Sequence, residues 1–107
     1  MIEEYLRRQA RWSSRTFGDG LRTVGITEHI KKECAEICAN PTDLEEWIDV
    51  MILALDGFWR AGGESHQIMW MLIDKQSKNF ARQWPRTAKA SDHQNTPGAA
   101  FQLASLS

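Results

Sequence analysis

Two pairs of carboxylates in this chain have the spacing of neighbours on one face of a helix. Glu33 and Glu36 form the first pair, and Glu46 and Asp49 form the second. Side chains three positions apart meet on a helix, and a short turn around residues 40–42 would bring the two pairs face to face in an antiparallel hairpin. Four converging carboxylates make an all-oxygen site suited to Mg²⁺ or Mn²⁺, and their mutual repulsion without a cation would be severe.

The segment that carries the second pair, residues 43–62, is predicted to be a helix that is apolar around most of its circumference. Pro41 and a capping box of Thr42 with Glu45 indicate its start, and Gly62 indicates its end. Such a helix belongs in a core or between subunits. Because unpaired carboxylates are costly there, metal ions or basic side chains must face its acidic stripe. The stripe comprises Glu45, Glu46, Asp49 and Asp56.

Two helices are predicted to precede this segment. The first runs from Ile2 to about Ser14, and its stripe of Arg7, Arg11 and Arg15 is either a solvated face or a contact for a ligand phosphate. The second runs from Gly25 or Ile26 to Ala39 and is expected to point Ile30, Cys34, Ile37 and Cys38 inward. The two cysteines are interpreted as small, reduced core residues, since a zinc site would need more ligands at suitable spacing.

A further helix is predicted from Ser65, as its N-cap, to Arg82 or Gln83. Its basic face is either solvated or holds a triphosphate, and we favour the second interpretation because the acidic site otherwise lacks a phosphate partner. This face comprises Lys75, Lys78, Asn79 and Arg82. The helical pattern stops after Trp84, so we expect one domain over residues 1–86 and a flexible tail over residues 87–107.

Composition narrows the class of protein. The chain has 107 residues, 42% of them hydrophobic, and a formal net charge of −1. One domain of ordinary globular composition is expected, and the charge argues against binding a nucleic-acid polymer. The first ten residues lack the apolar core of a signal peptide, and no apolar run is long enough to cross a membrane. We therefore expect a cytoplasmic location.

The same residues resemble a known family in their order and spacing. Glu33-Cys-Ala-Glu36 and Glu46-Trp-Ile-Asp49 resemble the paired motifs of the MazG-type all-α nucleoside triphosphate pyrophosphohydrolases. The longer pattern, over about residues 5 to 86, resembles the phage and prophage dATP/dGTP pyrophosphohydrolase branch. Its segments are Arg8-Gln-Ala-Arg-Trp12, Thr16-Phe-Gly-Asp-Gly, Arg22-Thr, His29-Ile-Lys-Lys-Glu, Asp43-Leu-Glu-Glu-Trp-Ile-Asp, Leu55-Asp-Gly and Lys75-Gln-Ser-Lys-Asn.

This resemblance implies an activity and an assembly. Members bind two or more Mg²⁺ or Mn²⁺ ions through the four carboxylates and hydrolyse a nucleoside triphosphate to the monophosphate and pyrophosphate. They form dimers or dimers of dimers in which helices of neighbouring subunits share a core. The resemblance makes Glu33, Glu36, Glu46 and Asp49 the catalytic and metal-binding residues, and places Lys75, Lys78, Asn79 and Arg82 at positions that bind phosphate.

Three more residues are candidates for contact with the substrate. Trp12, near Phe17 and a glycine-punctuated loop, is a candidate for the wall of a nucleobase pocket. Arg22 is a candidate for a phosphate contact. His29 either contacts the ligand or orients a carboxylate one turn away.

We therefore predict an all-α, MazG-like helical bundle of three long helices plus short pieces, with a core shared between the subunits of a homodimer or homotetramer. Its predicted function is metal-dependent hydrolysis of purine deoxynucleoside triphosphates, in control of the nucleotide pool or in support of a phage modified-base pathway. One alternative is a non-catalytic helical module that binds nucleotide or metal. Another is a purely structural helical oligomer.

Overall fold

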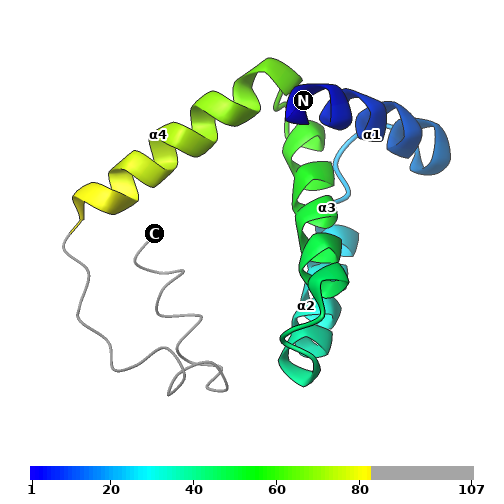
Figure 1. Cartoon of the computed structure of the whole chain (residues 1–107). Helices are drawn as coiled ribbons and strands as arrows, with labels where there is room; N and C mark the ends of the chain where they lie inside the picture. Colours follow the sequence, from blue (N-terminus) through cyan, green and yellow to red (C-terminus); the bar gives the residue numbers. More distant parts are fainter. Residues whose placement is uncertain (83–107) are drawn as a thin grey trace. The chain divides into compact units, whose positions relative to one another are not determined.

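The computed structural model describes residues 1–82, and all the regular secondary structure within them is helical. The helices are α1 (Ile2–Phe17), α2 (Thr23–Ala39), α3 (Leu44–Arg60), the short 3-10 helix η1 (Ser65–Gln67) and α4 (Ile68–Ala81) (Figure 1). The all-α prediction is confirmed. The four α-helices of this part have similar lengths, from 14 to 17 residues, so the expected division into long helices and short pieces does not apply. The predicted tail, Trp84 and the boundary at residue 86 lie outside the described residues.

The helix ends show where the sequence interpretation was wrong. The cap of α3 is Asp43, not Thr42, because its carboxylate accepts a hydrogen bond from the Glu45 backbone N–H at 3.1 Å. Likewise Glu64, not Ser65, is the N-cap at the start of η1, and it forms a capping box with Gln67. Carboxylates favour helix N-termini for electrostatic reasons as well. In both places an acidic residue one position away was the better acceptor.

Helix α1 continues one turn beyond its predicted end, to Phe17. The next residue, Gly18, has a φ of 83°, a conformation that glycine adopts without steric cost. Its N–H bonds to the carbonyl of Ser14 at 2.8 Å and closes the helix. The longer helix matters because it carries Trp12 and Phe17 on adjoining turns, next to the loop that leads into α2.

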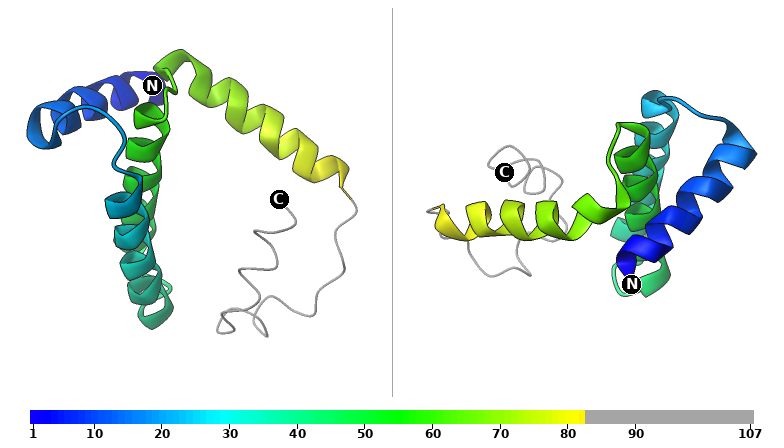
Figure 2. Two further views of the ribbon diagram at one scale, coloured as in Figure 1. Left: turned by 180° about the vertical axis from the view of Figure 1, so that it is seen from behind. Right: turned by 90° about the horizontal axis from the view of Figure 1, so that it is seen from above.

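Two packing relationships hold the first part of the chain together. Helices α2 and α3 lie side by side along their length as an antiparallel hairpin (Figures 1 and 2), and α1 packs against α3 and against η1. The described side chains that form the apolar core are Leu6, Ile26, Ile37 and Leu55. The predicted hairpin is present, and it fixes the register between the two carboxylate pairs.

Much apolar surface stays uncovered in a single chain. On α3, the side chains of Trp47 and Ile48 are 53% and 51% exposed. Cys34 and Cys38 on α2 are free and exposed, so the prediction that they are core residues was wrong for one copy of the chain. Their helix has one packing partner in the hairpin, which covers the face with Ile26 and Ile37 and leaves the cysteine face open.

The chain divides into two units within α4. Residues Met1–Met71 form the first, and the described part of the second is the remainder of α4 from Leu72. This remainder carries the predicted basic face. None of the helices within residues 1–82 combines the length and the apolar character needed to cross a membrane.

Candidate functional site

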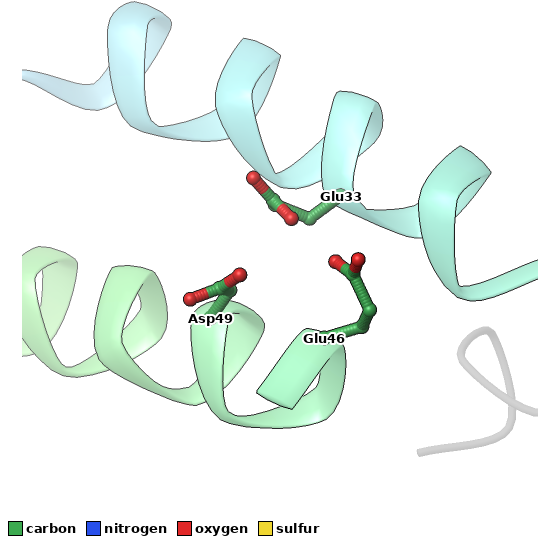
Figure 3. A group of neighbouring side chains, drawn as sticks. All are labelled: Glu33, Glu46 and Asp49. Carbon is green, nitrogen blue, oxygen red and sulfur yellow. The ribbon is translucent and has the colours of Figure 1, made fainter. Parts of the chain in front are cut away.

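Three carboxylates converge between α2 and α3. Glu33 projects from α2 toward Glu46 and Asp49, which lie one turn apart on α3 (Figure 3). Each of the three offers an oxygen atom, and these atoms all lie within 4.8 Å of one another. Glu33 is buried, Glu46 is half-buried and Asp49 is exposed, so the group opens to solvent on one side. Three of the four carboxylates predicted as metal ligands are therefore brought together within one chain.

The fourth predicted ligand, Glu36, adjoins this group. It is half-buried, and its carboxyl group is near enough to those of Glu33 and Glu46 to contribute to the raised pKa of both. Glu36 therefore adds to the crowding of carboxyl groups between α2 and α3.

The crowding shifts the protonation of two of these groups. Hydrogen bonding with Glu36 raises the pKa of Glu33, and desolvation and the charges of Glu36 and Asp49 act in the same direction. Desolvation raises the pKa of Glu46 to about 7, with further contributions from Glu36, Asp43 and Glu33. Burial and like charges both disfavour the ionised form of a carboxylate. Without a cation, the cluster holds protons at a pH where an ordinary glutamate has lost its own.

The donor set fits a divalent cation. One oxygen of Glu33 and one of Glu46 are buried and accept no hydrogen bond within the described residues. Buried polar atoms are almost always satisfied, and Mg²⁺ and Mn²⁺ prefer oxygen ligands, among them carboxylates. A cation between the helices would satisfy both oxygens and remove the repulsion that raises the two pKa values.

His29 supports the cluster from one side. Its Nε2 lies 3.1 Å from a carboxylate oxygen of Glu33, one turn further along α2. Since that oxygen differs from the one without a partner, the contact orients Glu33 and leaves its other oxygen available. This geometry favours the interpretation of His29 as a group that orients a carboxylate.

A pocket of about 370 Å³ lies between α1, α2 and α3, next to His29. Trp12 and Phe17 meet edge to face in its wall, with ring centroids 5.7 Å apart, and the guanidinium of Arg22 lies 4.4 Å from the centre of the Phe17 ring. The structure thus brings together the three predicted substrate contacts Trp12, Arg22 and His29. An aromatic wall with a cation beside it suits a flat, anionic ligand.

Asp56 does not belong to this cluster, although the sequence analysis assigned it to the acidic stripe. It is buried and pairs with Arg60 at 3.2 Å, while its other oxygen accepts from the Trp59 indole N–H at 2.7 Å. Arg60 was not predicted from the sequence as a partner of Asp56. The signal was present as an Asp and an Arg four positions apart on one helix.

The predicted phosphate-binding residues lie in the second unit, with Lys75, Lys78 and Asn79 on α4 and Arg82 directly after it. Lys78 pairs with Asp74 at 3.1 Å, and Asn79 donates to Gln76 at 3.3 Å. These contacts lie along α4 itself. The contribution of this face, with Lys75 and Arg82, to the carboxylate site stays a prediction.

Comparison with known proteins gives a family and one relative. A family profile described as dATP/dGTP pyrophosphohydrolase matches residues 5–99. The Eaa protein of Salmonella phage P22 is 40% identical over 83 residues, which are 78% of this chain and 26% of that protein. The match thus spans about a quarter of the relative's length. No solved structure gives a significant match to the chain.

Proposed function

Because the chain belongs to the dATP/dGTP pyrophosphohydrolase family, we propose that it hydrolyses dATP or dGTP to the monophosphate and pyrophosphate with the help of Mg²⁺ or Mn²⁺. The observation that carries this proposal is the meeting of Glu33, Glu46 and Asp49 within 4.8 Å. A bound divalent cation would supply Lewis-acid stabilisation of the phosphate charge and a more acidic water.

The chain's own residues have distinct parts in this reaction. Glu33, Glu46 and Asp49, with Glu36 beside them, would hold the cations, and the packing of α2 against α3 fixes their oxygens in advance. The attacking water forms a bond to the α-phosphorus, and the bond from that phosphorus to the bridging oxygen breaks. We assign the water's proton to one of the carboxylates on α2, Glu33 or Glu36. His29 keeps Glu33 oriented throughout.

The pocket beside His29 is the proposed site of the base. Trp12 and Phe17 offer the aromatic surface, and Arg22 is near enough to the ring of Phe17 to reach a phosphate or base edge from the same wall. Stacking on an aromatic side chain is worth roughly 1–3 kcal/mol per base. The basic face of α4 would meet the remaining phosphate charge.

Product analysis tests the reaction directly. The chain is incubated with each of the four deoxynucleoside triphosphates, with Mn²⁺, with Mg²⁺ or with a chelator. We expect monophosphate and pyrophosphate from the purine substrates and none with the chelator. In water labelled with heavy oxygen, attack at the α-phosphorus places the label in the monophosphate. Label in the pyrophosphate, or stepwise release of phosphate, would contradict the proposed bond cleavage.

The same assay separates the alternative function. A non-catalytic module would bind a purine nucleotide in the presence of Mn²⁺ and release no product over hours. The pairing of a cation site with an aromatic pocket would then serve recognition alone. A purely structural oligomer would be indifferent to nucleotide and chelator in both binding and thermal stability.

We also propose that two or more copies assemble through α1 and α3. An apolar groove of about 610 Å³ runs between these helices, lined by Met1, Ile2, Tyr5, Ile48, Met51, Ile52 and Leu55. The side chain of Met51 is 45% exposed, which is unusual for the centre of a helix with mostly apolar surroundings. In a two-fold symmetric dimer, the apolar residues of this groove in one copy would be covered by the same residues of the other copy.

Sedimentation checks this assembly. Ile48→Glu should shift the protein from a dimer or larger oligomer to a monomer, because a charge in an apolar interface must be desolvated. Glu45→Gln, on an exposed turn of the same helix, is the control and should leave the assembly unchanged. A wild-type chain that sediments as a stable monomer at micromolar concentration would contradict the proposed interface.

A further inference from the structure

Arg60 is the most completely bonded cation in the described part of the first unit. Its side chain is 1% exposed. Its Nε bonds to Asp56, its Nη1 bonds to the carbonyls of Gly18 and Gly20 at 2.9 Å each, and its Nη2 bonds to the hydroxyl and carbonyl of Ser13 at 2.9 and 3.4 Å. A guanidinium has five N–H donors. All of them are used, on acceptors from α1, from the loop after it and from α3.

The acceptors stand beside the residues that form the wall of the pocket. Ser13 follows Trp12 in the chain, and Gly18 follows Phe17. Gly20 lies two residues before Arg22, whose guanidinium rests on the Phe17 ring. Arg60 therefore bonds to backbone carbonyls within two residues of each of the three side chains in the wall, Trp12, Phe17 and Arg22.

The loop itself has little else to hold it. Gly18 and Gly20 both have positive φ, at 83° and 93°, and an added Cβ at either position would meet no atom within 4 Å. Loops of this kind have many backbone states unless specific bonds select one. The bonds to Arg60 and the contact of Ser14 with Asp19 provide that selection.

We propose that Arg60 is a positioning residue: it fixes the loop of residues 18–20 so that Trp12, Phe17 and Arg22 form a preorganised wall for the nucleotide. Asp56 keeps Arg60 in place and also lines the pocket. The inference rests on the proposed function, since the wall is taken to bind the substrate. Arg60 increases substrate affinity without contacting the substrate. The carboxylates on α2 and α3 bind the cation independently of it.

The chemistry of the side chain predicts which substitutions fail. Arg60→Lys should be defective although it keeps the positive charge, because an ammonium has three donors around one point and cannot reproduce a planar fork. Arg60→Met removes all five donors and keeps much of the side-chain volume. Ser13→Ala removes a single acceptor of Nη2 and is the mildest change.

The test compares these three variants with the wild type and with Arg8→Lys, an exposed arginine on α1 that serves as the control. Calorimetry gives Mn²⁺ affinity and then the affinity for a non-hydrolysable dGTP analogue. Steady-state assays give KM and kcat. Hydrogen exchange follows the amides of residues 17–22 and those of α2 and α3.

We expect KM and the analogue's Kd to rise about tenfold in Arg60→Lys and more in Arg60→Met. Mn²⁺ affinity should stay within about twofold of wild type, since the carboxylates are packed independently of the loop. Exchange should accelerate in residues 17–22 alone. Ser13→Ala should show the same pattern more weakly, which keeps the test open if Arg60→Met does not fold.

Three results would overturn the proposal. One is a faster loop exchange with unchanged nucleotide affinity, which would make Arg60 a stabiliser of the loop only. Another is a parallel loss of Mn²⁺ and nucleotide affinity, which would indicate general unfolding. The last is a wild-type chain that neither turns over nor binds nucleotide, which would refute the proposed function and, with it, the positioning role.

Discussion

Helix α3 carries two aspartates, Asp49 and Asp56, whose carboxylates have opposite electrostatic surroundings. Asp49 and Asp56 are separated by about two turns of the same helix. Asp56 is buried and receives hydrogen bonds from Arg60 and Trp59 within the chain. Asp49 faces Glu33 and Glu46, which repel it. The carboxylate of Asp56 therefore stabilises the fold, whereas that of Asp49 destabilises it when no cation is bound.

This difference teaches how to tell a structural carboxylate from a functional one. A buried ion pair with all its hydrogen bonds satisfied is the usual way to keep a charge inside a protein. Carboxylates gathered without a cation raise each other's pKa and leave oxygens without a partner, as at Glu33 and Glu46. Such a group is tolerated where it is used, which is why perturbed pKa values point to functional sites.

The largest expected effect is the loss of turnover when one of the mutually repelling carboxylates is removed. Glu46→Ala and Asp49→Ala should each lower monophosphate release by on the order of 100-fold or more, because the cation loses a ligand. The helical content should persist, since one of several mutually repelling charges is removed. Circular dichroism and the release assay measure the two properties.

Glu45→Ala is the matched control for both substitutions. Glu45 lies in the first turn of α3 and its side chain is outside the group formed by Glu33, Glu46 and Asp49. It should retain near wild-type turnover. Near wild-type turnover in both Glu46→Ala and Asp49→Ala would show that the site has been placed wrongly.

The same substitution at the two aspartates should destabilise the fold at Asp56 but not at Asp49. Asp56→Asn leaves the Arg60 guanidinium buried without a counter-charge and should cost about 3 kcal/mol. Asp49→Asn relieves repulsion and should leave the metal-free fold equally stable or more stable. Urea unfolding with a chelator present compares them. Equal destabilisation by both would erase the distinction between the two sites.

The sequence was sufficient for the fold class and for the carboxylate pairs. Their three-residue spacing and the short turn after Ala39 determine a hairpin in which the pairs face one another, whatever else packs against it. The role of Asp56 was not predictable in the same way. Its partner Arg60 lies one turn away, but its burial depends on Ser13 and on the loop after α1, and no local pattern predicts that loop.

The apolar residues show a second limit of sequence reasoning. A periodic pattern indicates that Trp47, Cys34 and Cys38 avoid water, but not whether they do so within one chain or between chains. All three are exposed in the single chain. The cap of α3 was predicted one residue away from its true position. Thr42 and Asp43 are both favourable cap residues, and the backbone geometry selects Asp43.

A smaller effect is expected from the basic face on α4. Lys78→Ala or Arg82→Ala should weaken binding of a non-hydrolysable dGTP analogue by about tenfold, the value of one charged hydrogen bond. Binding of Mn²⁺ alone should be unchanged, because neither side chain can ligate a cation. Lys31→Ala, an exposed lysine on α2 paired with Glu28, is the control. Unchanged nucleotide affinity in both variants would exclude this face and leave Arg7, Arg11, Arg15 and Arg22 as the candidates for phosphate contact.

The last prediction concerns pH, and its sign follows from the raised pKa of Glu46. Its ordinary value is 4.5 and its value in the metal-free fold is about 7, so the folded state binds this proton more tightly than the unfolded state does. The resulting stabilisation is complete below about pH 4.5 and disappears as the pH rises through about 7. The metal-free protein should therefore lose stability over this range, as seen in its Tm.

A cation competes with the proton for the same oxygens, so Mn²⁺ should raise Tm increasingly from pH 5 to about 7. Glu46→Gln, which cannot ionise, should flatten the metal-free curve. A wild-type curve as flat as that of Glu46→Gln would mean that Glu46 titrates normally, and that its carboxylate is met by a charge in the fold, as that of Asp56 is.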